Sequence, residues 1–305
     1  MKSNDPIQHH YVPQVYLKGF TNEKGDLIQY DIKYKTFAQK KPAQVGYKID
    51  YFKIQRPETK IINQITDEYL IEKNSFTEQE NNYPKLVSQI TGNTDSPFAI
   101  ARKQLELLVA TLITIKRRNP SFKETMTGEI KNHAASDAFK NQVAPYMELA
   151  RQIDKQDPEI YIETVKEQFR NEPSKSSDLY ISSFLDPYPS IVKQVTETLL
   201  ASQTNIWYVP PGIEFITSDN PGFILSGTEV LNFGGLGGSH LFAFPLTPAA
   251  CIVIDSEVPA LLSIESTMIH PKVVENWQVK MINQATAKVA MSKLFARNKS
   301  SLAHL

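Results

Sequence analysis

Apolar and polar positions alternate near the start of the chain, and this pattern predicts short strands. Residues 26–31 alternate apolar and polar side chains directly after the turn-like residues 22–25. Aromatic and β-branched residues continue this composition around Phe37 and at residues 51–54. We therefore expect residues 11–54 to be β-rich and to carry an amino-terminal hairpin arm.

The pattern changes to helical spacing between about residues 64 and 203. The strongest predicted helix covers residues 97–118, with Ser96 as its N-cap and Pro97 in its first turn. Its apolar residues cover a wide arc, which is typical of a helix that is buried on most sides. Further helices are predicted at residues 121–154, 158–171 and 187–202.

Strand patterns return after residue 204. One predicted hairpin joins residues 205–209 to 214–217, and a second joins 241–244 to 250–254. A last amphipathic helix is predicted from about residue 272 to 296.

The segregation of strands and helices along the chain predicts an α+β fold. It would hold an amino-terminal hairpin arm, a large helical middle, antiparallel carboxy-terminal strands and a final long helix. We interpret residues 1–305 as one domain, with a helical block at about 64–203. The β-rich part would be formed by residues 11–54 and 204–260.

Composition narrows the class of protein. The 305 residues hold 33 basic and 33 acidic side chains, and this balance argues against a dedicated nucleic-acid coat protein without excluding a local basic groove. The single cysteine, Cys251, lies in an apolar run and is expected to be buried, so neither a disulfide nor a cysteine zinc site can form. No run is long and apolar enough to span a membrane, which predicts a cytoplasmic protein of bacterial type without a membrane partner.

Two adjacent histidines, His9 and His10, are the first candidates for chemistry. Neutral imidazole is a common metal ligand and a common base near pH 7. Neighbouring side chains of an extended segment point to opposite faces, so only one of the two should face a site. Pro13 holds the segment extended, and we expect His10 to face the site. A purely structural role is the alternative.

A second candidate lies where an apolar strand ends in Ser218, Asp219 and Asn220 before Pro221. Asp219 could bind a metal ion or act as a base, while Ser218 and Asn220 could hold a substrate oxygen. The alternative is an Asx-turn, in which these side chains only cap their own backbone.

Three weaker candidates complete the set. Arg118 follows the buried helix and could clamp a phosphate or carboxylate, or could only offset the helix dipole. The glycines of residues 234–238 are interpreted as a flexible loop, because no Lys-Ser/Thr pair follows them, and His240 at their end is a weak candidate. Glu80 stands out among the acidic residues for the reason given next.

Several motifs together resemble the domain-of-unknown-function 4238 family. The opening His10-Tyr11-Val12-Pro13-Gln14 is similar to the His-Tyr-Val-Pro-Gln start of that family, and residues 215–221 are similar to its Phe-Ile-Thr-Ser-Asp-Asn-Pro signature. Glu80 and Arg118 lie where the family has a glutamate and an Arg-Thr-Pro motif, although Asn119 replaces the threonine. The resemblance spans residues 9–297 and implies no reaction.

Together these residues predict one composite site and leave two functions open. The first is a metal-dependent hydrolase acting on nucleic acid or another phosphoester. Its catalytic residues would be His10, Arg118 and Asp219, and a divalent metal ion would lie on Glu80 and Asp219. Substrate would contact Tyr11, Gln14, Ser218 and Asn220.

The second possible function is a non-catalytic ligand-binding or regulatory module of a mobile-element or phage-defence system. Net charge lends nucleic-acid binding no support, and the oligomeric state stays open.

Overall fold

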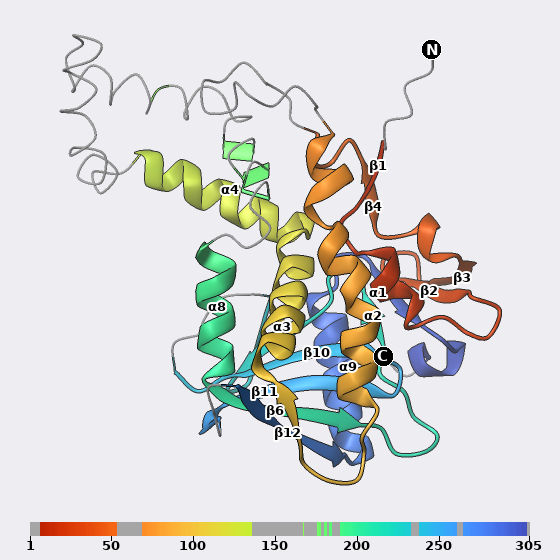
Figure 1. Cartoon of the computed structure of the whole chain (residues 1–305). Coiled ribbons are helices and arrows are strands. Elements are labelled where there is room, and N and C mark those ends of the chain that lie inside the picture. Colours follow the sequence, from red (N-terminus) through yellow and green to blue (C-terminus); the bar gives the residue numbers. More distant parts are fainter. Residues whose placement is uncertain are drawn as a thin grey trace.

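A computed structural model of the chain has a mixed α+β fold, as the sequence predicts (Figure 1). The structure describes residues 7–53, 69–135, 190–232, 238–260 and 265–303, together with residues 167, 176, 177, 180, 181, 183 and 184. Most of the helices predicted between residues 136 and 189, and the glycine-rich residues 234–237, lie outside the described residues.

A seven-stranded sheet forms the centre of the fold (Figure 1). Its neighbours pair antiparallel except for one parallel pair, β12 with β6. In spatial order the strands are β5 (Phe98–Ala101), β12 (Ser266–Val273), β6 (Ser202–Tyr208), β11 (Ala250–Pro259), β10 (Leu241–Thr247), β8 (Phe223–Ser226) and β9 (Glu229–Leu231). The predicted hairpin at residues 241–254 is the β10–β11 pair.

Helices cover both faces of this sheet, because alternate residues of its strands are buried in two different cores. On β11, Ile252 and Ile254 pack into a core shared with Leu105 and Leu112. Cys251 and Val253 pack on the other side, and Cys251 is fully buried as expected. Helices α2 (Thr77–Thr91), α3 (Arg102–Arg117) and α8 (Ser190–Leu200) pack into the first core, and α9 (Asn276–Val289) packs into the second. Helix α4 (Pro120–Ala135) packs instead against a third cluster that contains Phe76 and Phe184.

Two smaller sheets carry the start of the chain. The four-stranded sheet has the order β3 (Thr36–Lys40), β2 (Leu27–Asp31), β13 (Lys293–Ala296) and β7 (Thr217–Ser218). The two-stranded sheet joins β1 (Gln8–His10) to β4 (Tyr47–Ile49). Short helical turns complete the fold: α1 (Gln14–Lys18), η1 (Pro42–Gln44), η2 (Ile71–Ser75) and η3 (Lys299–Leu302).

The predicted helix at 97–118 begins later than the sequence indicates. Residues 98–101 form strand β5, which pairs with β12, and the helix α3 starts only at Arg102. The backbone N–H of Arg102 donates to the carbonyl oxygen of Glu265 at 3.0 Å. Pairing with a strand from a distant part of the chain therefore outweighs the local capping signal of Ser96 and Pro97.

Two predictions for the carboxy-terminal part are wrong in detail. The expected hairpin between residues 205–209 and 214–217 does not form, because β6 pairs with β11 and β12 while β7 pairs with β13. The expected helix at 272–296 is also too long. Residues 272 and 273 end strand β12, helix α9 ends at Val289, and residues 293–296 form strand β13.

Candidate functional site

Strand β1 turns its two histidines into different surroundings. His9 is fully buried, its ring stacks on Phe52 at a centroid distance of 6.0 Å, and its Nδ1 accepts a hydrogen bond from the Phe52 backbone at 2.7 Å. His10 pairs with Tyr47 in β4, and its backbone N–H lies 3.4 Å from the Glu72 carboxylate. His9 therefore packs inside the protein, whereas His10 borders a pocket.

Arg118 forms hydrogen bonds to both strand β1 and helix α2. Its Nη1 donates to Glu80 Oε1 at 2.6 Å, and its Nη2 donates to the backbone carbonyl of His10. The guanidinium plane lies over the ring of Phe76, 3.8 Å from the centroid, and the side chain is 2% exposed. A buried guanidinium is stable only when paired and hydrogen-bonded, and both conditions are met here.

These residues meet at one pocket of about 320 Å³. Four sequence-predicted site residues line it: His10, Gln14, Glu80 and Arg118. The remaining lining residues are Val15, Lys18, Glu72 and Asn81. The pocket lies between strand β1, helix α1, the π-helical turn η2 and helix α2, and its volume suits a small ligand.

Three buried polar atoms of this lining have no hydrogen-bond partner. They are His10 Nε2, Glu72 Oε2 and Arg118 Nε. Within the described residues only eight such side-chain atoms occur, so three of eight belong to residues of this one pocket. Because burying a polar atom without a partner destabilises the fold, such a concentration points to a ligand site.

Burial also moves the pKa of two of these residues. Desolvation lowers the pKa of His10, and the nearby Arg118 charge lowers it further, against opposing hydrogen bonds to the backbone of Ala43 and Gln8. Desolvation raises the pKa of Glu72 to about 7, although Arg118 and the His10 backbone N–H favour its charged form. These shifts favour an uncharged His10 and a Glu72 that keeps its proton to higher pH than an ordinary glutamate.

Asp219 lies outside this pocket's lining and serves a different purpose. Its carboxylate accepts hydrogen bonds from the backbone N–H groups of Met291, Ser292 and Lys293 at 2.8, 2.9 and 3.0 Å, and from Ser292 Oγ at 2.9 Å. Burial raises the pKa of Asp219, and these bonds oppose the shift. The carboxylate therefore joins the end of β7 to the start of β13.

The neighbours of Asp219 also bond within the protein. Ser218 Oγ accepts the backbone N–H of Asn220 at 3.1 Å. The Asn220 Oδ1 accepts a hydrogen bond from the ammonium of Lys116 at 2.7 Å. The Asn220 Nδ2 donates hydrogen bonds to the side-chain oxygen of Asn232 and to the Val289 carbonyl. Lys116 is 1% exposed and also donates to the carbonyl of Gly222 at 2.6 Å. None of Ser218, Asp219 and Asn220 lines the pocket.

The remaining sequence candidates are placed as follows. Tyr11 is buried beside Tyr51, outside the pocket lining, and both burial and the Asp219 charge raise the pKa of its hydroxyl. His240 is buried, and its ring bonds to the Gly238 carbonyl at 2.9 Å. Asn119 donates to the Asp219 carbonyl at 2.7 Å, which links the motif after α3 to the motif after β7.

Sequence reasoning missed Glu72 and Lys18. Glu72 did not stand out among the acidic residues, because no spacing or flanking motif distinguishes it. Its role becomes visible only when the π-helical turn η2 places it against β1. Such turns are often found at functional sites, but nothing in the local sequence predicts one here.

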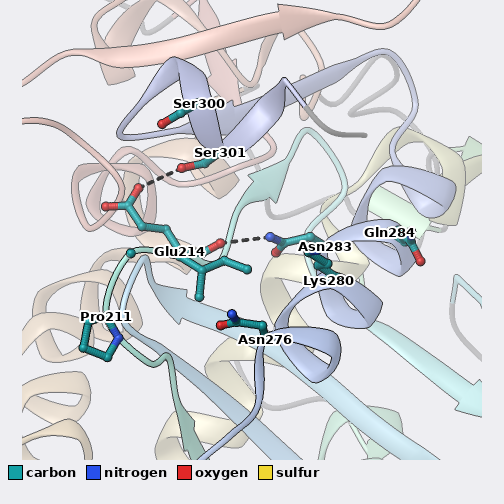
Figure 2. Close-up of a pocket in the computed structure, with 10 residues that line it drawn as sticks. Pro211, Glu214, Asn276, Lys280, Asn283, Gln284, Ser300 and Ser301 are labelled. Atoms are coloured by element: carbon teal, nitrogen blue, oxygen red, sulfur yellow. Dashed lines mark hydrogen bonds between the residues drawn. The ribbon is translucent and has the colours of Figure 1, made fainter.

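A larger pocket, of about 620 Å³, lies between the loop at residues 211–214, helix α9 and the turn η3 (Figure 2). Glu214 and Asn283 lie at its centre, where the Glu214 carboxylate accepts Ser301 Oγ and its carbonyl accepts the Asn283 amide. None of its lining residues holds an unpartnered buried polar atom, and none was predicted as a site residue. The smaller pocket is therefore the better candidate.

The described part of the chain contains no group of three or more His, Cys, Asp or Glu side chains placed to hold a metal ion. Glu80 lines the pocket and pairs with Arg118, whereas Asp219 bonds to residues 291–293. The two residues predicted as metal ligands thus have separate partners. Among the helices of the described residues, none combines the length and apolar character needed to cross a bilayer.

Comparison with protein families finds a match over residues 8–300 to the family described as "Protein of unknown function (DUF4238)". No curated protein and no solved structure matches the chain.

Proposed function

The chain belongs to the DUF4238 family, and we propose that this member is a hydrolase that cleaves a phosphoester by acid–base catalysis in the pocket of His10, Glu72 and Arg118. One observation carries the proposal. Three unpartnered buried atoms in one pocket supply a base, an acid and a hydrogen-bond donor. These are the groups that hydrolysis of an anionic ester needs.

Each group has a distinct step. His10 Nε2 takes a proton from a water molecule, whose oxygen attacks phosphorus. The bond from phosphorus to the leaving oxygen breaks, and the protonated Glu72 carboxyl gives its proton to that oxygen. The Arg118 Nε–H binds a phosphoryl oxygen, and Lys18 adds a second positive charge at the same pocket. A proton passes from His10 back to Glu72 before the next turnover.

The raised pKa of Glu72 and the lowered pKa of His10 suit these roles. A general acid must hold its proton near neutral pH, and a general base must be free of one. The proposed reaction uses no metal ion on Asp219, because both carboxylate oxygens of Asp219 already accept hydrogen bonds from backbone N–H groups.

Turnover of phenyl phosphate and p-nitrophenyl phosphate tests the proposal. His10→Gln should lower kcat/KM about 100-fold or more for both esters, the usual contribution of a general base. Glu72→Gln should lower it to that extent for phenyl phosphate and less for the nitrophenyl ester, whose leaving group is less basic and needs a general acid less. Glu78→Gln is the matched control, because Glu78 lies exposed in the first turn of the neighbouring helix α2. An unchanged kcat/KM in both pocket variants would contradict the proposed roles.

A ligand-binding module without turnover is the second candidate. The observation that favours it is the double attachment of Arg118 to Glu80 and to the His10 carbonyl, since a ligand at Arg118 could alter how β1 is held. Calorimetric titration with phosphate monoesters separates the two functions. Binding without release of nitrophenol would support this candidate over hydrolysis.

A further inference from the structure

Residues 32–49, which we call the basic segment, concentrate positive charge in one stretch of the chain. They contain five lysines and no acidic residue, whereas the whole chain balances 33 basic against 33 acidic residues. Lys41 pairs with Asp26 at 2.6 Å. The charge of the segment therefore rests on Lys33, Lys35, Lys40 and Lys48, all exposed except for the half-buried Lys40.

Exposed aromatic rings accompany these lysines. Tyr34 is 67% exposed at the turn between β2 and β3, between Lys33 and Lys35 in the sequence. Phe37 on edge strand β3 is 36% exposed, with the ammonium of Lys299 4.6 Å from its ring centroid. Proteins that bind single strands combine positive charge with aromatic rings on which bases stack, and this segment offers both groups.

The basic segment leads to the candidate site. It starts at the tip of the β2–β3 hairpin and ends in β4, beside β1 (Figure 1). Its Tyr47 pairs with His10, and the ring of His10 bonds to the backbone of its Ala43. Lysines and aromatic rings thus lie on a continuous stretch of chain whose far end borders the pocket.

We propose that the basic segment binds single-stranded nucleic acid. Lysine ammonium groups neutralise backbone phosphates, and exposed rings stack on bases. Bases of a duplex are already stacked on each other, so rings on a protein surface favour unpaired strands. Balanced net charge is compatible with this role, because the positive charge is local.

The binding itself is independent of the proposed reaction. Only the idea that the bound strand is also cleaved rests on the proposed function, since the segment would then deliver a phosphodiester to the pocket. Binding is therefore measured on the full chain and on Glu72→Gln, which should bind equally well.

Fluorescence anisotropy with labelled oligothymidylate and oligouridylate of about 16 nucleotides tests the proposal. The triple variant Lys33→Gln, Lys35→Gln, Lys40→Gln should bind at least tenfold more weakly. Between about 50 and 200 mM salt, its slope of log affinity against log salt should be shallower by about 2. Tyr34→Ala, which leaves the charge intact, should weaken binding about fivefold or more without changing the slope.

The matched control replaces three exposed lysines of other elements by Gln: Lys193, Lys272 and Lys288. Equal weakening in this control, or wild-type protein that binds neither oligonucleotide, would overturn the proposal. So would wild-type binding to phosphatidylserine vesicles in place of the oligonucleotides. If the strand binds but no phosphoester is cleaved, this inference stands and the proposed hydrolysis fails; the reverse result leaves hydrolysis standing alone.

Discussion

At the scale of single residues, the carboxylate of Asp219 acts as an anchor between two distant segments. Four hydrogen bonds from three consecutive residues occupy its oxygens. The sequence placed Asp219 correctly at the end of an apolar strand, but its partners lie more than 70 residues further along the chain. Local patterns contain no information about such a pairing, so the sequence left open an Asx-turn and a catalytic group and did not predict the anchor.

Replacing Asp219 by Ala should lower the free energy of unfolding by about 3 kcal/mol, because three buried N–H groups lose their acceptor. Urea denaturation measures this change through the midpoint at constant slope. Asp95→Ala is the control, since Asp95 is exposed, and its effect should stay within about 0.5 kcal/mol. Equal effects of the two substitutions would rule out the anchoring role.

Glu72 should make stability fall with rising pH. Its pKa rises from 4.5 in the unfolded chain to about 7 in the fold, so the folded state holds a proton that the unfolded chain releases between these values. The contribution of Glu72 to the free energy of unfolding is thus greatest below pH 4.5 and decreases as the pH rises to about 7. Glu72→Gln should flatten this decrease in urea titrations between pH 5 and 7.5, by roughly 1–3 kcal/mol. Glu78→Gln is the control. If the free energy of unfolding of Glu72→Gln falls with pH as steeply as that of the wild type, the raised pKa of Glu72 is contradicted.

Activity should follow the same two groups. If His10 is the base and Glu72 the acid, the logarithm of kcat/KM falls below the lowered pKa of His10 and above about pH 7. The expected profile is a narrow bell, measurable with phenyl phosphate, whose basic leaving group needs the acid, after correction for the ionisation of the substrate. A rate that keeps rising above pH 8 would assign the acid to another residue.

At the scale of elements, the boundary between α9 and β13 shows why periodicity alone misjudged the last helix. Apolar residues continue at helical spacing past Val289. However, the N–H groups of residues 291–293 donate to Asp219, and this leaves them unable to make the bonds to carbonyls four residues earlier that continue a helix. The coarse order of strands, a helical block and further strands was predictable, whereas β5, β13 and the partners of β6 and β7 depend on residues far away in the sequence.

Strand β1 should loosen when Arg118 is changed to Gln. The substitution removes the ion pair with Glu80 and weakens the bond to the His10 carbonyl. Amide hydrogen exchange in β1 and β4 should then accelerate about 10- to 100-fold, while exchange in the β10–β11 pair stays unchanged.

The control is Arg102→Gln, whose partner Glu106 lies on the same helix at 3.0 Å in a half-buried pair. Its exchange rates in β1 should equal those of the wild type. Faster exchange throughout the protein in Arg118→Gln would indicate a general loss of stability in place of a local attachment.

At the scale of the whole molecule, the prediction of one domain leads to a single unfolding transition. Buried Trp207 reports on the large sheet, and far-ultraviolet circular dichroism reports mainly on the helices. Lys116, at the end of α3, bonds to Asn220 after β7, which ties the helical block to the small sheet. We therefore expect the fluorescence and dichroism midpoints in urea to coincide. Separate midpoints would divide the chain into two units.

The four-stranded sheet also limits how early the protein can fold during synthesis on the ribosome. Strand β2, near the start of the chain, pairs with β13, and Tyr16 bonds to Thr217 at 2.6 Å across 201 residues. Strand β2 and Tyr16 leave the ribosome before these partners and cannot complete their pairings until β13 has been synthesised. Nascent chains that stop before β13 should therefore contain every pocket residue while strand β2 still lacks one of its two partner strands.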